Sequence, residues 1–171
     1  MNPRQAYKFC PRCGNKLEEK TDSMRCVSCN YDLYLNPIPC NGVIIENENK
    51  EILLVKRKFE PQKGFWDVPG GFINSGEELE HSVKREILEE ISVEVEMTGI
   101  VGIYKDSYVF QGIKFPTLGI MVSAKIISGT LKAADDAEEF KYFTKQQVSE
   151  LSIAFDAVKR ALDDYFKHNF S

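Results

Sequence analysis

The chain has no apolar run that approaches the 18 or more residues of a transmembrane helix, and its first nine residues lack the apolar stretch of a signal peptide. With only 11 glycines and 7 prolines among 171 residues, it is neither of low complexity nor broadly disordered. Basic residues are not in excess, because 22 Lys and Arg stand against 26 Asp and Glu. These absences predict a folded cytoplasmic protein that does not attract nucleic acid or membranes through its overall charge.

The length and the hydrophobic content set the domain organisation. A chain of 171 residues has room for one ordinary domain and a small module but not for two full-size domains. Its 43% hydrophobic residues are enough for a buried core. The change in pattern near residue 40 divides the chain into a module at 1–38 and a larger domain at 39–171.

Four of the five cysteines form two CxxC pairs with twelve residues between them: Cys10, Cys13, Cys26 and Cys29. In a reducing compartment such pairs bind metal rather than form disulfides, and four thiolates suit tetrahedral Zn²⁺. Gly14 and Asn30 follow the two pairs and tolerate the positive φ that such turns need. Since four protein ligands leave no open position, we expect a structural zinc. Four reduced core cysteines and a redox CxxC are the weaker alternatives.

The larger domain alternates short apolar strands with helical patterns. Residues 43–45 and 52–55 predict a hairpin, and a helix is expected from about Glu77 to Ile91, with Ser75 and Glu78 forming a capping box. Strands are expected at 93–104, 107–111, 115–127 and 139–143, and helices near 145–150 and 153–167. This order favours an α+β or α/β sandwich with a mixed sheet.

The predicted helix at 77–91 carries two different stripes. Its apolar stripe faces the core, whereas a second stripe holds three carboxylates, Glu86, Glu89 and Glu90, at spacings where like charges repel. Arg85 is one candidate that could compensate them. The other is a divalent cation, since carboxylates on one rigid face suit Mg²⁺ or Mn²⁺. Taken alone, such a triplet is usually solvated surface.

The stretch from Gly71 to Val93 supplies the missing context. It reads Gly71-x5-Glu77-x7-Arg85-Glu86-Ile87-x-Glu89-Glu90-x-Ser92-Val93 and resembles the signature box of the Nudix hydrolases. Ser92 is the one departure, because the family has glycine there, where the helix end favours positive φ. The resemblance implies a Nudix α/β/α sandwich with a mixed sheet, preceded here by a small zinc ribbon.

The resemblance also implies roles for the residues of the box. Glu86 and Glu90 would be the principal Mg²⁺ or Mn²⁺ ligands, and Glu89 a ligand or a base. Arg85 would orient a carboxylate, and Gly71 and Glu77 would support the box. Relatives often add an acidic group from a later loop. In the acidic cluster at 135–139, Asp136 matches this group best by its spacing from Tyr142 and Phe143. The alternative is that the cluster is a solvated turn.

A zinc ribbon before a Nudix domain resembles the branch that includes NADH pyrophosphatases and enzymes acting on ADP-ribose or FAD. By this likeness Tyr34 and Phe72 would contact substrate, with ordinary packing as the alternative. Arg57 could reach phosphates, although a cation that follows a strand usually faces solvent. The downstream NADH-branch motif is missing, because residues 104–112 read YKDSYVFQG. We therefore do not expect dedicated NADH selectivity.

The predicted function is metal-dependent hydrolysis of the diphosphate in a nucleoside diphosphate linked to another moiety, such as NADH, ADP-ribose or FAD, into two monophosphates. One alternative is a non-catalytic module that senses nucleotides or binds RNA or protein. Another is decapping of nucleotide-capped RNA, which the net charge of +3 in residues 1–30 mildly favours. A small nucleotide is the preferred partner, and both a monomer and a homodimer are compatible with the sequence.

Overall fold

A computed structural model describes residues 1–168 and divides the chain into two compact units. The first unit contains Met1–Ile38 and Ser107–Thr117, and the second contains Pro39–Asp106 and the residues from Leu118 onward. The chain therefore leaves the first unit after Ile38 and returns to it at 107–117, a segment that the sequence assigned to the larger domain. Within the described residues, no helix has both the length and the apolar character needed to cross a membrane.

The first unit is built from a short helix and a small sheet. Helix α1 (Pro3–Ala6) begins with a capping box in which Asn2 and Gln5 bond each other's backbone N–H groups. Strands β1 (Leu17–Glu19), β2 (Ser23–Cys26) and β3 (Asp32–Tyr34) form an antiparallel sheet in the order β1-β2-β3. Its buried hydrophobic residues are Cys10, Met24 and Cys26. A core of this size cannot hold the segment together without further cross-links.

The second unit contains three helices and most of two three-stranded sheets, while the end of one long hairpin, at 107–117, belongs to the first unit. One sheet has the order β4-β8-β7, with β4 at Ile38–Ile45, β7 at Val93–Phe110 and β8 at Ile113–Gly129. The other has the order β6-β5-β9, with β5 at Ile52–Arg57, β6 at Trp66–Asp67 and β9 at Ala137–Phe143. The helices are α2 (Leu79–Ile91), α3 (Lys145–Glu150) and α4 (Asp156–His168). This arrangement confirms the predicted α+β class.

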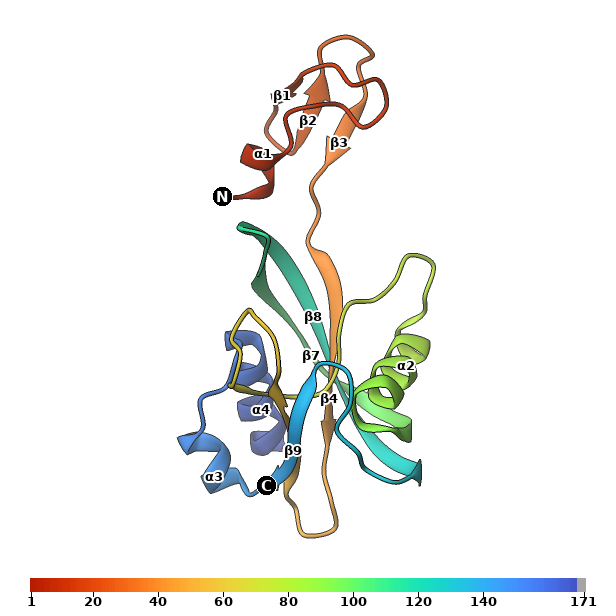
Figure 1. The fold of residues 1–171 in the computed structure, drawn as a ribbon, viewed down its shortest axis with the longest axis vertical. Coiled ribbons are helices and arrows are strands. Elements are labelled where there is room, and N and C mark those ends of the chain that lie inside the picture. The colour runs from red at the N-terminus through yellow and green to blue at the C-terminus, as the bar shows by residue number, and fades with distance from the viewer. Residues whose placement is uncertain (169–171) are drawn as a thin grey trace. The chain divides into compact units, whose positions relative to one another are not determined.

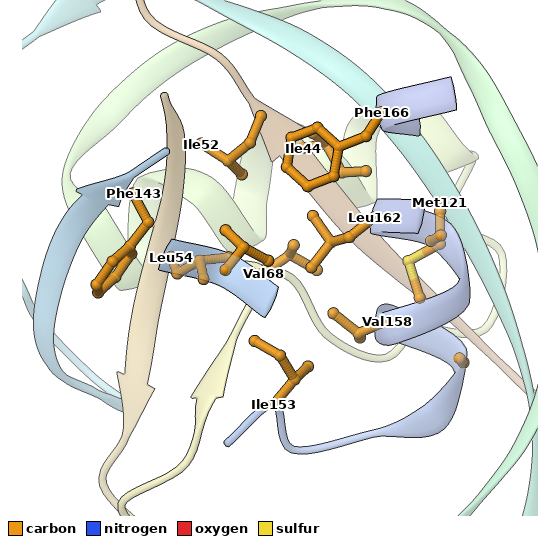
Figure 2. Close-up of a cluster of buried hydrophobic side chains, with 13 residues drawn as sticks. Ile44, Ile52, Leu54, Val68, Met121, Phe143, Ile153, Val158, Leu162 and Phe166 are labelled. Carbon is orange, nitrogen blue, oxygen red and sulfur yellow. The ribbon is translucent and has the colours of Figure 1, made fainter. Parts of the chain in front are cut away.

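Alternate residues of β4 and β5 face opposite layers of this unit. Ile44 and Leu54 pack with α4 in one core cluster, together with Leu162 (Figure 2). Their chain neighbours Val43 and Leu53 belong to a second cluster, which includes three residues of α2: Val83, Ile87 and Ile91. Figure 1 shows α2 and α4 on opposite sides of the strands. Because successive side chains of each strand point to opposite faces, hydrophobic residues form a core on both faces, as a three-layer sandwich requires.

The hairpin predicted from residues 43–55 is wrong in its pairing. The chain does turn between β4 and β5, but the two strands belong to different sheets and are linked by an isolated bridge between Glu46 and Ile52. Strand β5 instead pairs with β9 along its length and with β6 at Val55 and Lys56. One of its edges is therefore occupied by β9, a strand distant in sequence, which local patterning could not reveal.

Three element boundaries also differ from the predictions. Helix α2 begins at Leu79, and its N-cap Glu78 makes no side-chain capping bond, so the capping box proposed for Ser75 and Glu78 is wrong. Strand β7 runs unbroken from residue 93 to 110 where two strands were expected. Helix α4 begins at Asp156 rather than near residue 153, because Trp66 exchanges backbone hydrogen bonds with residues 152 and 154 and holds them extended.

Candidate functional site

The four paired cysteines of the first unit converge on one point. Their Sγ atoms all lie within 4.8 Å of one another. Individual Sγ–Sγ distances are 3.8 Å for Cys10–Cys29, 3.4 Å for Cys13–Cys26 and 3.4 Å for Cys13–Cys29. Tetrahedral Zn–S bonds of about 2.3 Å require Sγ atoms about 3.8 Å apart. The cluster therefore fits a four-coordinate zinc ion.

The turns after each cysteine pair explain this convergence. Gly14 and Asn30 have φ of +75° and +55°, as the sequence predicted. The Gly14 N–H donates to the Cys10 carbonyl at 2.9 Å, and the Asn30 N–H donates to the Cys26 carbonyl at 3.2 Å. Backbone and side-chain hydrogen bonds from Asn15 lower the pKa of Cys13 to about 6. The pKa of Cys29 is lowered by the Tyr31 backbone but raised more by the neighbouring sulfur atoms and by desolvation, and it reaches about 12.

In the second unit, Arg85 of α2 organises the acidic stripe. Its guanidinium donates to both carboxylate oxygens of Glu77, at 2.8 and 2.9 Å, and this pair lowers the pKa of Glu77 to about 2. A third guanidinium nitrogen donates to Glu86 at 2.7 Å and to Glu89 at 3.1 Å. The Phe72 carbonyl accepts a further bond at 3.1 Å. Arg85 thereby offsets the repulsion along the stripe and links α2 to the loop that precedes it.

The glycine pair before the helix lies directly against two of the carboxylates. The Gly70 N–H donates to Glu90 Oε2 at 3.1 Å. A Cβ atom on Gly71 would come within 2.5 Å of the Glu86 carboxylate, so a larger residue at position 71 would displace that group. Gly70 has φ of +143°, which few residues with a side chain adopt. The loop therefore needs glycine at both positions to approach the carboxylates.

Burial sets the electrostatics of this group. Glu90 is 8% exposed, and desolvation, opposed by the Gly70 N–H bond and assisted by Asp67, Glu86 and Asp136, raises its pKa to about 8. Burial also raises the pKa of Glu86, whereas the Glu89 side chain is 47% exposed. Buried carboxylates with raised pKa values and oxygen donors on one face fit a divalent cation, which would hold them ionised.

The later acidic loop comes close enough to act on this site. Asp136 lies near enough to Glu90 to contribute to its raised pKa. Its backbone carbonyl accepts a hydrogen bond from the Lys58 N–H at 3.0 Å, which attaches the loop to the end of β5. The neighbouring Asp135 has φ of +46°. The structure thus brings Asp136 towards the carboxylates, and its role as a ligand stays a prediction.

Arg57 is engaged within the protein. Its Nη1 lies 3.3 Å from Asp67 Oδ2, its Nε donates to the Pro61 carbonyl at 2.9 Å, and its guanidinium lies 5.0 Å from the Phe155 ring centroid. Asp67 is buried, and desolvation raises its pKa to about 7. Asp67 was missed by the sequence analysis, although an acid between Trp66 and Val68 in an apolar strand was a usable signal.

The two aromatic residues assigned to substrate fall in different units. Phe72 is 38% exposed in the second unit and forms an isolated bridge with Cys40, one residue beyond the glycine pair. Tyr34 is 61% exposed and lines a cavity of about 320 Å³ within the first unit, together with Tyr7, Phe9 and Phe115. Both side chains are accessible to a ligand, and their substrate contacts stay predictions.

Ser92 closes the helix of the box. It is the C-cap residue of α2, has φ of 59° and ψ of 31°, and its N–H donates to the Leu88 carbonyl at 3.1 Å. The left-handed conformation that glycine would favour is therefore kept by serine. This departure from the family pattern leaves the direction of the chain after α2 unchanged.

Comparison with known proteins adds relatives along nearly the whole chain. The NUDIX domain family matches residues 38–165. An ADP-ribose pyrophosphatase of Methanocaldococcus jannaschii is 36% identical over 93% of this chain and 88% of its own length. An NAD-capped RNA hydrolase NudC of Vibrio atlanticus is 30% identical over 95% of this chain, which spans only 60% of that relative.

A solved structure extends the similarity to three dimensions. The crystal structure of a NUDIX hydrolase from Nitrosomonas europaea superposes with a TM-score of 0.79 and 27% sequence identity, covering 96% of this chain and 93% of that chain. The similarity thus extends beyond the residues that form the box.

Proposed function

Because the chain belongs to the Nudix hydrolase family, we propose that it hydrolyses the diphosphate bond of a nucleoside diphosphate linked to another moiety, with ADP-ribose as the first substrate to test. NADH and FAD are further candidates of the same chemical class. The products would be two monophosphates. Mg²⁺ or Mn²⁺ would serve the reaction, and Zn²⁺ would fill the cysteine cluster.

The observation that carries this proposal is the convergence of Glu86 and Glu90 on the glycine pair. Glu90 accepts the Gly70 N–H, and the Glu86 carboxylate lies against Gly71. A nucleotide-binding module without turnover would have no need to bury these repelling carboxylates, which destabilise a helix when no cation is bound. The geometry therefore supports catalysis over the non-catalytic alternative.

The residues of the acidic stripe and their partners would have different roles in the reaction. Glu86 and Glu90, with Glu89 as a further ligand or a base, would hold a divalent cation, which would supply positive charge for the diphosphate and lower the pKa of a water molecule. Arg85 fixes the direction of Glu86 and Glu89 through its hydrogen bonds, and Glu77 fixes Arg85. Glu89, the most exposed of the three, would act either as a ligand or as the base that accepts a proton from the attacking water, and its exposure supports the second role.

The comparisons and the exposed aromatics both bear on substrate class. An ADP-ribose pyrophosphatase matches 93% of this chain and 88% of its own length, whereas the NudC relative is matched over only 60% of its length. Phe72, one residue from the glycine pair, presents a partly exposed ring on which an adenine base could stack. Nucleoside triphosphates offer no second moiety, so we expect them to be poor substrates.

The test is substitution of Glu90 by glutamine, which keeps the shape and removes the ligand charge. Glu90→Gln should lower kcat for ADP-ribose by about a hundredfold to a thousandfold with Mg²⁺ or Mn²⁺ while the melting temperature is maintained. The matched control is Glu80→Gln on the exposed face of the same helix, where Glu80 pairs only with Lys84. A Glu90→Gln variant as active as this control would refute the metal assignment.

A second candidate is the removal of a dinucleotide cap from RNA. The NudC relative supports it, as do the three exposed aromatic rings of Tyr7, Phe9 and Tyr34 around the cavity of the first unit, since bases of single strands stack on such rings. Parallel assays with NAD and with an NAD-capped oligonucleotide separate the candidates. A higher kcat/KM for the capped RNA would favour this function.

We further propose that the zinc-bound segment at 1–38 is a separately folded ribbon and that 39–171 is the hydrolase domain. The sparse buried core of the first unit and the cysteine cluster support this division. We also propose a cytoplasmic location, and light scattering tests assembly into a homodimer.

A further inference from the structure

Asn41 is a buried polar residue that the box and its metal ligands do not account for. It is 5% exposed and lies near the middle of β4. Because side chains alternate along a strand, Asn41 shares a face with Val43 and Ile45, which both pack in the cluster that contains α2. Asn41 therefore continues the α2-facing row of β4, with a carboxamide in place of an apolar side chain.

Two hydrogen bonds place Asn41 between the glycine loop and the acidic helix. Its backbone N–H donates to the Gly71 carbonyl at 2.8 Å, and its Nδ2 donates to Ser82 Oγ at 2.9 Å. Ser82 is fully buried and also accepts a bond from Arg85 at 3.3 Å. One side chain thus connects β4 to the helix turn that precedes Glu86.

The other end of the carboxamide has no partner. Asn41 Oδ1 is the one buried side-chain polar atom without a hydrogen bond among residues 1–168. A buried acceptor left unsatisfied costs about 1–3 kcal/mol, so a missing donor is expected nearby. Oδ1 lies against Gly70, since a Cβ on that residue would come within 2.9 Å of it. The N–H of the same Gly70 donates to Glu90. Gly70 therefore contacts both Asn41 Oδ1 and the Glu90 carboxylate, which is a proposed metal ligand.

We propose that Asn41 is a positioning residue of the diphosphate site, in which Oδ1 accepts a hydrogen bond from a water molecule bound beside Glu86 and Glu90. Ser82 holds the carboxamide by its Nδ2 so that Oδ1 faces that water. A buried water needs two or more polar partners, which the carboxamide oxygen and the Glu90 carboxylate on the other side of Gly70 would supply. The inference rests on the proposed metal-dependent function, and it assigns this role to Asn41 of β4, outside the box.

The experiment measures Mn²⁺ binding as well as turnover. Asn41→Ala should weaken the affinity for Mn²⁺ alone, measured by paramagnetic resonance titration, and lower kcat for ADP-ribose, each by about tenfold to a hundredfold with KM changed less than threefold. Mn²⁺ should also raise the melting temperature of this variant less than that of the parent. Ser82→Ala keeps Oδ1 but frees the carboxamide, so a smaller loss in the same direction is expected.

Two comparisons separate positioning from a general loss of stability. In a double-mutant cycle, Asn41→Ala with Ser82→Ala should be no worse than Asn41→Ala alone, because both act through one carboxamide. Asn47→Ala is the control, since Asn47 makes three side-chain hydrogen bonds in the turn after β4, away from the carboxylates. It should lower stability and leave Mn²⁺ affinity unchanged.

The proposal is overturned if Asn41→Ala binds Mn²⁺ and turns over ADP-ribose like the parent, or if Asn47→Ala shows the same losses. Should Asn41→Ala fail to fold, Ser82→Ala with unaltered Mn²⁺ affinity and kcat overturns it. Glu90→Gln distinguishes this failure from failure of the proposed function. An inactive Glu90→Gln beside a normal Asn41→Ala rejects only the role of Asn41, whereas an active Glu90→Gln rejects the metal site itself.

Discussion

The two units of this chain are stabilised in different ways. The segment at 1–38 buries Met24, Pro3 and two of its four clustered cysteines, and it leaves Phe9 and Tyr34 more than half exposed. The second unit buries two clusters of hydrophobic residues, one on each face of its strands. A cluster of four cysteines that fits one metal ion therefore lies where the segment is too short to form an apolar core. In the larger unit, the buried hydrophobic clusters are sufficient to stabilise the fold. The acidic stripe of α2 is therefore not needed for stability and can serve catalysis.

The largest expected difference between the two units follows from the removal of one cysteine. Cys13→Ser should release zinc and unfold residues 1–38, because zinc binding supplies on the order of 10 kcal/mol to such modules. The second unit should keep its fold, since its clusters contain no residue of that segment. Elemental analysis with hydrogen exchange measures both. Cys40→Ser is the control, because Cys40 lies outside the cluster, and a zinc-free chain with 1–38 still protected from exchange would contradict the prediction.

The second prediction concerns the opposite case, in which a cavity is made in the hydrophobic core of the second unit. Leu54 is fully buried between β5 and α4, so Leu54→Ala should lower the free energy of unfolding of the second unit by about 2–5 kcal/mol. Zinc content should remain at one ion per chain. Denaturant titration measures the loss, with Ile100→Ala as the exposed control that should change little. Loss of zinc together with the core would show that the two units depend on each other.

A smaller effect concerns pH in the second unit. Burial raises the pKa of Asp67 from 3.8 to about 7, so the folded chain holds a proton that the unfolded chain has released between those values. Stability should therefore fall as pH rises from about 4 to 7, by on the order of 2–4 kcal/mol. Asp67→Asn should flatten this slope in melting curves, although Glu90, with a pKa of about 8, still contributes part of it. Parallel pH profiles of parent and variant would contradict the assignment.

The smallest expected effect is at the end of α2. Ser92 holds a left-handed conformation with φ of 59°, so Ser92→Gly should raise the stability of the second unit by up to about 1 kcal/mol. Ser92→Ala keeps the Cβ and removes only the hydroxyl, so it should not stabilise. Thermal melts compare the two variants. Equal melting temperatures would mean that the conformation at residue 92 carries no strain.

Local spacing was enough to predict much of this molecule. The doubled CxxC predicted the convergence of four thiols, and the positive φ at Gly14 and Asn30 followed from the turns that such pairs need. The helix that carries Glu86, Glu89 and Glu90 was predicted within two residues at its start and correctly at its end. Such features depend on residues close together in the chain, where period and turn chemistry act directly.

Only the tertiary structure decided which distant groups meet. Strand β5 pairs with β9, more than eighty residues further along the chain, instead of with β4. Burial that raises the pKa values of Asp67 and Glu90 comes from elements on several sides, and the contact of Asn41 with Ser82 joins a strand to a helix. Desolvation and long-range hydrogen bonds depend on the packed arrangement of the whole unit, and no local pattern of residues encodes them.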